Sequence, residues 1–344
     1  MKISSLQVLR GVAAWLVVYH HYMQMFYEFK SDSLIGKIFS HRGGFGVDVF
    51  FVLSGFFMYL TANKENSGFI FFTKRLFRVA PTYWFYTFVL LLISQIFVNQ
   101  FNFTSFTTSS IFSSLFFIPH NNPSGLGVYP FLTVGWTLNL EVSFYTILSL
   151  CILINKRNCI LLCSLIVSSL PIALHLIKSD IVILHALKSQ LMWQFICGFC
   201  VAILYSKIDL RNKHNTTIGV IFIIASIVFI SGIIGYGTIQ KTISATFLVI
   251  GFLFVNKIFD DEAWLVRTFV KLGDYSFSTY LSHIIIIGVF LHYFGNTLTA
   301  LTEAGVLIGI TVITYMISSL SFKWVENSKS VISLRDRIIA TRKL

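Results

Sequence analysis

A short list of ionisable residues deep within the apolar runs of this chain gives the first candidates for chemistry. A side chain of this kind costs about 2.5–3.5 kcal/mol at the centre of a membrane helix, so each one suggests a function. An imidazole can act as a general base at neutral pH, and a guanidinium can bind phosphate. The residues are Arg10, His20, His21, Asp48, Glu141, His283 and His292.

The first apolar run, 8–28, places an arginine and a histidine on one helical face. Arg10 and His21 are eleven residues apart, which is about three turns and an axial rise of about 16 Å. His20 falls about 100° away from that face. The pair would set a cation near one membrane surface and a titratable imidazole near mid-membrane. Alternatively, His21 bonds a neighbouring helix and Arg10 is an interfacial anchor.

Two carboxylates and an arginine pair add to these candidates. Asp48 lies near the start of the run 46–62 and can orient an imidazole, pair with a cation or cap a helix, and Glu141 lies in the run 131–154. Arg75 and Arg78 are three residues apart, so they share a helical face as a polyphosphate would require. Such a cluster is also typical of a stop-transfer signal or a lipid anchor.

The elements that must position these residues are about ten membrane helices. Residues AVILMFWYC make up 56% of the 344 residues and DEKR only 12%, and the mean hydropathy is +0.78, which excludes a soluble globular protein. We predict an all-α polytopic membrane bundle. The apolar runs near the length that crosses a bilayer are 8–28, 46–62, 79–98, 131–154, 159–177, 187–205, 216–234, 242–256, 275–294 and 304–322.

The distribution of charge predicts the orientation of this bundle. If the N-terminus is cytoplasmic, 20 of the 26 Lys and Arg residues fall on the cytoplasmic side, as the positive-inside bias requires. Both termini are then cytoplasmic. The net charge of +12 therefore reflects topology, and we expect no nucleic-acid partner. We divide the chain into a bundle, 1–322, and a short basic cytoplasmic tail, 323–344.

The cysteines and the N-terminus exclude other classes. The five cysteines are odd in number and lie in or beside apolar runs, so we expect neither a disulfide framework nor a metal site, despite the CxxC spacing of Cys197 and Cys200. The first run lacks a small-residue cleavage site and carries charge, so it is not a signal peptide.

The order of motifs resembles the acyltransferase-3 family, integral-membrane O-acyltransferases of bacterial surface polysaccharides. A doublet, His20-His21, stands where that family has its catalytic histidine, and the spacing from Arg10 selects His21; Asn327 replaces a frequent proline. The matching segments are Leu9-Arg10-Gly11 with His21, Gly46 to Phe56, Arg75-x-x-Arg78 followed by Pro81-x-Tyr83-Trp84, Trp136 to Tyr145 with Glu141, Tyr275 to His283 with Tyr280, and Trp324-x-Glu326.

The resemblance implies a donor, an acceptor and roles for these residues. The donor would be cytoplasmic acyl-CoA, most simply acetyl-CoA, and the acceptor a hydroxyl of a glycan or lipid-linked oligosaccharide of O-antigen (lipopolysaccharide), capsule or exopolysaccharide. The membrane would be the bacterial inner membrane, and the form one without an appended extracytoplasmic esterase-like domain. The implied sets are catalytic His21, Asp48 and Glu141; donor-binding Arg10, Arg75, Arg78, Tyr83 and Trp84; and acceptor-binding Trp136, Tyr280 and His283.

Two other functions fit the same residues less well. A proton-coupled secondary transporter also uses buried ionisable groups, but the chain lacks an internal repeat and paired broken helices. A glycan binder without chemistry is the third interpretation.

The connection 99–130 has no acidic or basic residue apart from His120 and is rich in Phe, Ser, Thr and Asn. This composition suits either contacts with sugars or an interfacial lid.

The predicted topology can be tested with reporter fusions. Because the charge bias sets orientation, fusions in three basic connections and at the C-terminus should report a cytoplasmic location, and those in three intervening connections an external one. An external location for any fusion that is expected to be cytoplasmic would contradict the ten-helix topology. The cytoplasmic positions are Asn66, Arg157, Asn212 and Lys343, and the external ones are Asp32, Asn122 and Gly235.

Overall fold

The computed structural model describes residues 3–96, 105–178, 180–208, 215–259, 263–295 and 300–341. The fusion positions Asn212 and Lys343 lie outside these ranges, as do 99–104 of the long connection. Within them the chain is α-helical, and the β-pairing is an isolated bridge between Asn121 and Val128. The all-α prediction is therefore confirmed.

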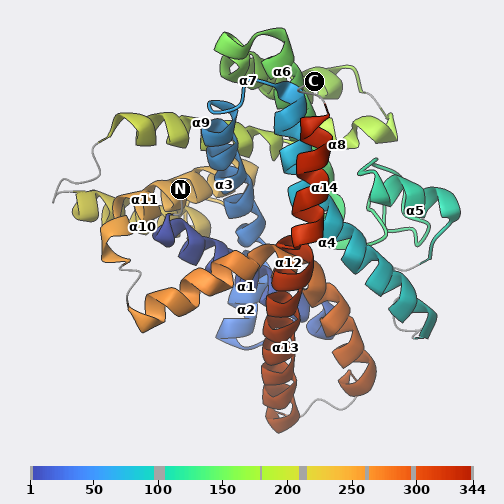
Figure 1. The fold of residues 1–344 in the computed structure, drawn as a ribbon. Coiled ribbons are helices and arrows are strands. Elements are labelled where there is room, and N and C mark those ends of the chain that lie inside the picture. Colours follow the sequence, from blue (N-terminus) through green and yellow to red (C-terminus); the bar gives the residue numbers. More distant parts are fainter. Residues whose placement is uncertain are drawn as a thin grey trace. The chain divides into compact units, whose positions relative to one another are not determined.

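Helices follow one another along the chain with short 3-10 turns between some of them (Figure 1). The described α-helices are α1 (Ser4–Tyr27), α2 (Leu34–Arg42), α3 (Phe45–Ala62), α4 (Gly68–Ile96), α5 (Thr108–Leu115), α6 (Trp136–Ile154), α7 (Cys159–Leu176), α8 (His185–Lys188), α9 (Met192–Lys207), α10 (Asn215–Ser231), α11 (Thr238–Phe254), α12 (Trp264–Phe294), α13 (Ala300–Ser321) and α14 (Lys329–Ala340).

Seven stretches of the described chain are long and apolar enough to cross a membrane. They contain α3, α4, α6, α7, α9, α12 and α13, which match seven of the ten predicted runs. The predicted runs 216–234 and 242–256 correspond to the shorter apolar helices α10 and α11. The run 8–28 corresponds to α1, a 24-residue helix that is not among the seven. The chain is thus a polytopic membrane protein.

Several boundaries differ from the sequence-based ones. Helix α4 begins at Gly68 and α12 at Trp264, about ten residues before the predicted apolar runs, because polar residues on one helical face lower the local hydropathy without ending the helix. Arg75 and Arg78 therefore lie within α4, although they precede the predicted apolar run 79–98. The short helices α2 and α5 were not predicted.

The chain forms two compact units. The first contains residues 1–64 and 190–277, and the second contains 65–189 and 278–344, so α12 contributes to both. In the first unit α3 packs against α1, α9 and α11, and α10 lies beside α11 (Figure 1). Its core is apolar and includes residues from four helices: Leu6, Leu9, Ala13, Val49, Val52, Phe56, Val201, Ala202, Ala245 and Val249.

Glycines bring the helices of the first unit into backbone contact. A methyl group on Gly55 of α3 would overlap the carbonyl oxygen of Phe195, and one on Gly198 of α9 would overlap that of Val52. Gly46 meets the carbonyl of Ala13 in α1 in the same way. Small residues at helix crossings are how membrane helices gain packing contacts without a hydrophobic driving force. These contacts fix the register of α3 against α1 and α9.

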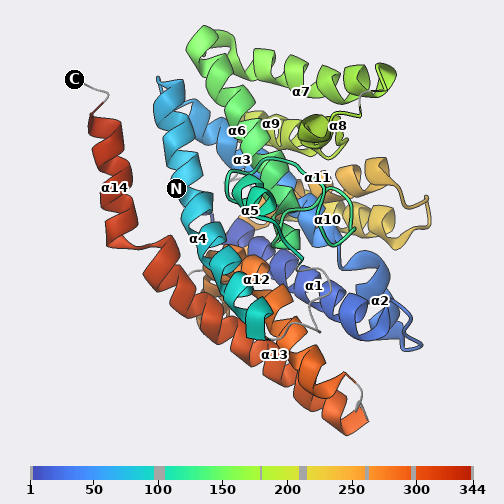
Figure 2. The same ribbon diagram turned by 90° about the vertical axis from the view of Figure 1, so that its right-hand side faces the viewer.

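In the second unit α4 packs against α6, and α6 against α7 (Figure 2). Pro81 lies inside α4 and has no N–H to donate, so it divides the helix into a part with Arg75 and Arg78 and a part with Tyr83 and Trp84. The first turn of α4 approaches α6 closely, since a methyl group on Gly68 would overlap the Ser149 carbonyl.

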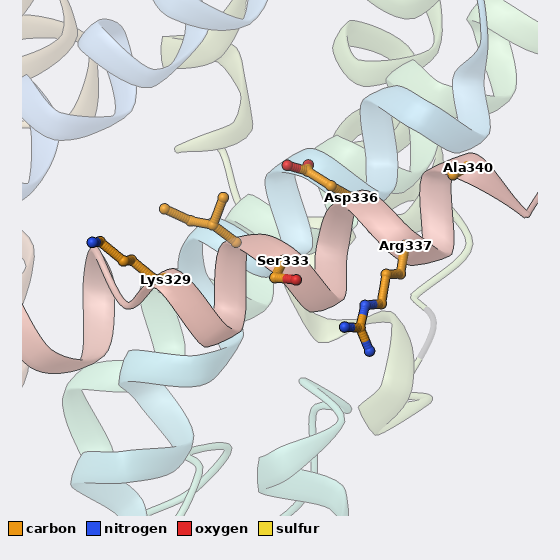
Figure 3. Close-up of a pocket in the computed structure, with 6 residues that line it drawn as sticks. Lys329, Ser333, Asp336, Arg337 and Ala340 are labelled. Carbon is orange, nitrogen blue, oxygen red and sulfur yellow. The ribbon is translucent and has the colours of Figure 1, made fainter.

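The segment expected as a basic tail is also helical. A π-helix, Phe322–Glu326, follows α13, and α14 packs against α4 with Ile339 buried. A shallow groove follows one face of α14, and none of the candidate site residues contributes to it. All its lining residues come from that one helix: Lys329, Ile332, Ser333, Asp336, Arg337 and Ala340 (Figure 3).

The glycine contacts generate a stability prediction. Gly198→Ala should lower the melting temperature of the purified protein in detergent, because the methyl group overlaps backbone of α3 and such overpacking costs about 1–3 kcal/mol. Gly305→Ala in α13 is the matched control, since a methyl group there meets no atom within 4 Å. Equal melting temperatures for the two variants would contradict the close α3–α9 contact.

Candidate active site

Each of the two histidines of α1 makes a hydrogen bond through its Nδ1, and the carbonyl groups that accept these bonds lie in different parts of the chain. His20 Nδ1 lies 3.0 Å from the Phe39 carbonyl oxygen of α2, and His21 Nδ1 lies 3.0 Å from the Val17 carbonyl oxygen of its own helix. A carbonyl oxygen can only accept, so Nδ1 carries the proton in both neutral rings. Nε2 then has the lone pair that a general base or nucleophile needs.

The surroundings of His20 are those of a packing residue. Its ring lies 4.9 Å from the Phe29 ring and faces Gly44 of the turn before α3. Together with the bond to Phe39, these contacts join α1 to α2 and to the start of α3. His21, half-buried, is bonded through Nδ1 within its own helix. The structure thus gives the two members of the doublet different environments.

Arg10 lies two turns from the start of α1 and is half-buried. Its guanidinium donates to the Gln7 side-chain oxygen across 3.3 Å. The helix is continuous from Arg10 to His21, so the axial rise of about 16 Å between them follows from helix geometry. This is a separation that an extended thioester arm can bridge.

Asp48, in the first turn of α3, is 3% exposed and accepts a hydrogen bond from Gln194 Nε2 of α9 across 2.5 Å. The sequence left three roles open for this carboxylate, to orient an imidazole, to pair with a cation or to cap a helix, and none of them involved Gln194. The residue was missed because only ionisable groups were sought inside apolar runs. An amide between Trp193 and Phe195 is also expensive in a membrane, and that signal could have identified it.

Glu141 and Arg75 lie together in the second unit. Tyr145 donates its hydroxyl proton to the Glu141 carboxylate, and the Arg75 guanidinium interacts electrostatically with both Glu141 and Tyr145. Arg75 is 8% exposed, whereas Arg78 is exposed and adds a like charge nearby. The arrangement leaves one arginine compensated inside the unit and one presented at its surface.

Tyr83 and Trp84 contact the segment that follows α4. The Trp84 indole donates to the Leu115 carbonyl across 2.7 Å, and the Tyr83 ring lies 5.0 Å from the Phe117 ring. These contacts hold α5 and the turn after it against the middle of α4. A role of either aromatic residue in binding the donor stays a prediction.

The three predicted acceptor-binding residues belong to the second unit. The Tyr280 hydroxyl donates to the Val134 carbonyl across 2.9 Å and lies 3.0 Å from Thr137 Oγ1, which joins α12 to the start of α6. His283 is fully buried, and its Nδ1 lies 3.2 Å from the Thr279 carbonyl. Trp136 is half-buried at the first position of α6. Their contact with an acceptor stays a prediction.

The described structure therefore sorts the predicted residues into two groups. Arg10, His21 and Asp48 belong to the first unit. The second holds the remaining eight: Arg75, Arg78, Tyr83, Trp84, Trp136, Glu141, Tyr280 and His283. Among the residues searched in the described ranges, no group of three His, Cys, Asp or Glu side chains is arranged to hold a metal ion.

Comparison with known proteins gives a family match over most of the chain. Residues 3–321 match the family model described as an acyltransferase domain. The exopolysaccharide production protein ExoZ of Rhizobium meliloti (strain 1021) is 28% identical over 166 residues, which are 48% of this chain and 52% of that protein. The alignment thus spans about half the length of this curated relative. No solved structure matches the chain.

The different surroundings of the two histidines lead to a prediction. His21→Ala should lower the expected acyl-transfer activity by about 10²–10⁴-fold, the usual contribution of a placed imidazole, while the protein remains in the membrane. His20→Ala should retain more activity and lose stability, because it removes the bond to Phe39. An inactive His20→Ala beside an active His21→Ala in a membrane assay would reverse the assignment.

Proposed function

Because the chain belongs to the acyltransferase-3 family and is a membrane acyltransferase, we propose that it moves an acetyl group from cytoplasmic acetyl-CoA to a glycan hydroxyl. The acceptor is a bacterial surface polysaccharide or its lipid-linked precursor, and the membrane is the bacterial inner membrane. The observation that carries this proposal is His21 of α1, a half-buried imidazole whose Nδ1 is bonded to the Val17 carbonyl so that Nε2 bears the lone pair.

In this reaction the C–S bond of the thioester breaks and a C–O bond to the sugar forms. His21 Nε2 takes the proton of the sugar hydroxyl, which attacks the thioester carbonyl, and the proton passes to the departing thiolate to give free CoA. A route in which His21 first accepts the acyl group has the same overall balance. The Asp48 carboxylate stabilises the imidazolium electrostatically.

The donor phosphates bind at Arg75 and Arg78 of the second unit. Arg78 is exposed and can meet a phosphate directly, and the like charge of Arg75 nearby makes an anion favourable there. Planar guanidinium groups bind phosphate oxygens in a bidentate manner. Glu141 compensates Arg75 when no donor is present, and its part in the reaction is electrostatic.

The acceptor class is an exopolysaccharide in preference to O-antigen or capsule. The name of ExoZ, exopolysaccharide production protein, supports this choice. The folded segment around α5 offers exposed aromatic rings, Phe112 and Phe116, and several hydroxyls, which suit sugar faces and sugar hydroxyls. We propose that the acetyl group passes to the glycan directly.

The test is reconstitution of the purified chain in vesicles with acetyl-CoA and an oligosaccharide acceptor. Acetylated oligosaccharide should form, and mass spectrometry should identify it. Consumption of acetyl-CoA without glycan acetylation, until another periplasmic protein is added, would contradict direct transfer. Uptake of solute without any acetyl transfer would instead indicate a transporter.

The donor site can be tested in the same preparation. Arg78→Ala should weaken acetyl-CoA binding by about tenfold, and Arg78→Lys should restore it only in part, because an ammonium cannot make the bidentate contact. Arg75→Ala should weaken binding and also lower stability, since it leaves Glu141 without its counter-charge. Arg157→Ala, at an exposed cation elsewhere, is the control. Unchanged donor affinity in both alanine variants would leave the pair with a topological role.

A further inference from the structure

Gln194 is a fully buried amide on α9 that bonds two other helices of the first unit. Its Nε2 donates to Asp48 Oδ1 of α3 across 2.5 Å and to Thr242 Oγ1 of α11 across 3.2 Å. An amide that bridges three apolar helices is costly to bury unless its hydrogen bonds are made.

The neighbours of Gln194 determine which way the amide points. Thr242 Oγ1 donates its one proton to the Thr238 carbonyl across 2.8 Å, so towards Gln194 it can only accept. In the same structure Asp48 Oδ1 accepts from the Gln194 amide nitrogen. Both contacts therefore require the amide nitrogen. The opposite orientation would set the Gln194 oxygen against a carboxylate.

This orientation leaves Gln194 Oε1 buried without a hydrogen-bond partner among the described residues. An unsatisfied buried acceptor is destabilising, because the oxygen has lost its hydrogen bonds to water. The amide keeps the orientation in spite of that cost, because a hydrogen bond to a charged group is among the strong ones. The pair of Asp48 and Gln194 thus dominates the polar interactions at this point of the bundle.

Helix packing holds the pair in place. Gln194 lies one turn before Gly198, whose contact with the Val52 carbonyl brings α9 against α3, and the Phe51 and Phe195 rings lie 5.1 Å apart beside it. Lys241 of α11 adds a positive charge that interacts with Asp48. The carboxylate is therefore surrounded by a donor, a cation and close-packed backbone.

We propose that Gln194 is a positioning residue of the acyltransferase, which keeps Asp48 ionised and in one orientation. Asp48 then presents a fixed negative charge when the α1 histidine becomes an imidazolium. The proposal rests on the proposed function for its catalytic consequence, and on the geometry of the first unit for the placement of the carboxylate.

The test compares three variants with wild type in the reconstituted acetyl-transfer assay. Gln194→Met keeps the length of the side chain and removes the amide, and should lower kcat by about tenfold or more while KM for acetyl-CoA changes little. Gln194→Glu should be at least as inactive, because it sets two carboxylates together. Gln190→Met makes the same change at an exposed position four residues earlier, in the turn before α9, and should behave as wild type.

The double variant Asp48→Asn with Gln194→Glu separates positioning from packing. In this variant the amide stands at residue 48 and the carboxylate at residue 194, so the hydrogen bond between the two side chains can form again. The melting temperature should therefore recover from that of Gln194→Glu towards the wild-type value. The kcat should not recover, since the carboxylate has moved from α3 to α9. Recovery of wild-type kcat in the double variant, or a wild-type kcat in Gln194→Met, would overturn the proposal.

An infrared measurement tests the placement of the charge without the transfer assay. Wild type should show no protonated-carboxyl band from Asp48 at neutral pH, whereas Gln194→Met should show one that disappears on adding Asp48→Asn. Spectra of wild type and Gln194→Met that do not differ would overturn the proposal. A wild-type protein that transfers no acetyl group would contradict the proposed function, and the infrared comparison then decides the role of Gln194 by itself.

Discussion

A charged side chain within an apolar helical bundle needs a donor or a counter-charge, and the helices are packed to supply one. In the first unit the Asp48 carboxylate receives the Gln194 amide. In the second, the Arg75 guanidinium interacts electrostatically with Glu141, which in turn accepts from Tyr145. Removing one partner of such a pair leaves a buried charge uncompensated, which is far more costly than the net gain from the pair. The polar residues therefore constrain the packing of the helices that carry them.

Glycine makes that packing possible in the first unit. Where Gly55 and Gly198 face each other across α3 and α9, each backbone lies against a carbonyl of the opposite helix. At this short separation an amide on α9 can reach a carboxylate on α3 directly. Had larger residues separated the helices, water or a longer side chain would have been needed to bridge them. Helix α3 also contacts α1 at Gly46. The helix that carries the Asp48 carboxylate is therefore packed directly against the helix that carries the two histidines.

Hydrogen bonds to backbone carbonyls fix the tautomer of the two α1 histidines. Each has Nδ1 committed as a donor, so the catalytic capacity of either ring resides on Nε2. What separates the two is the rest of their surroundings: His20 joins α1 to α2, while the Nδ1 bond of His21 stays within α1. The sequence alone does not distinguish His20 from His21. Their surroundings do, since His20 is a packing residue and His21 is the candidate base.

Composition and apolar periodicity by themselves determined that the chain is an all-α polytopic membrane protein, because membrane helices must satisfy their own backbone and leave long apolar runs. The order of motifs around Arg10, Asp48, Arg75 and Glu141 also identified the family that the match over residues 3–321 shows. Helix ends were less predictable: α4 starts at Gly68 because a helix continues through polar residues on one face. The partners of the polar groups could not be predicted at all. Gln194 lies 146 residues from Asp48 along the chain, and only the close approach of α3 and α9 brings its amide to the carboxylate.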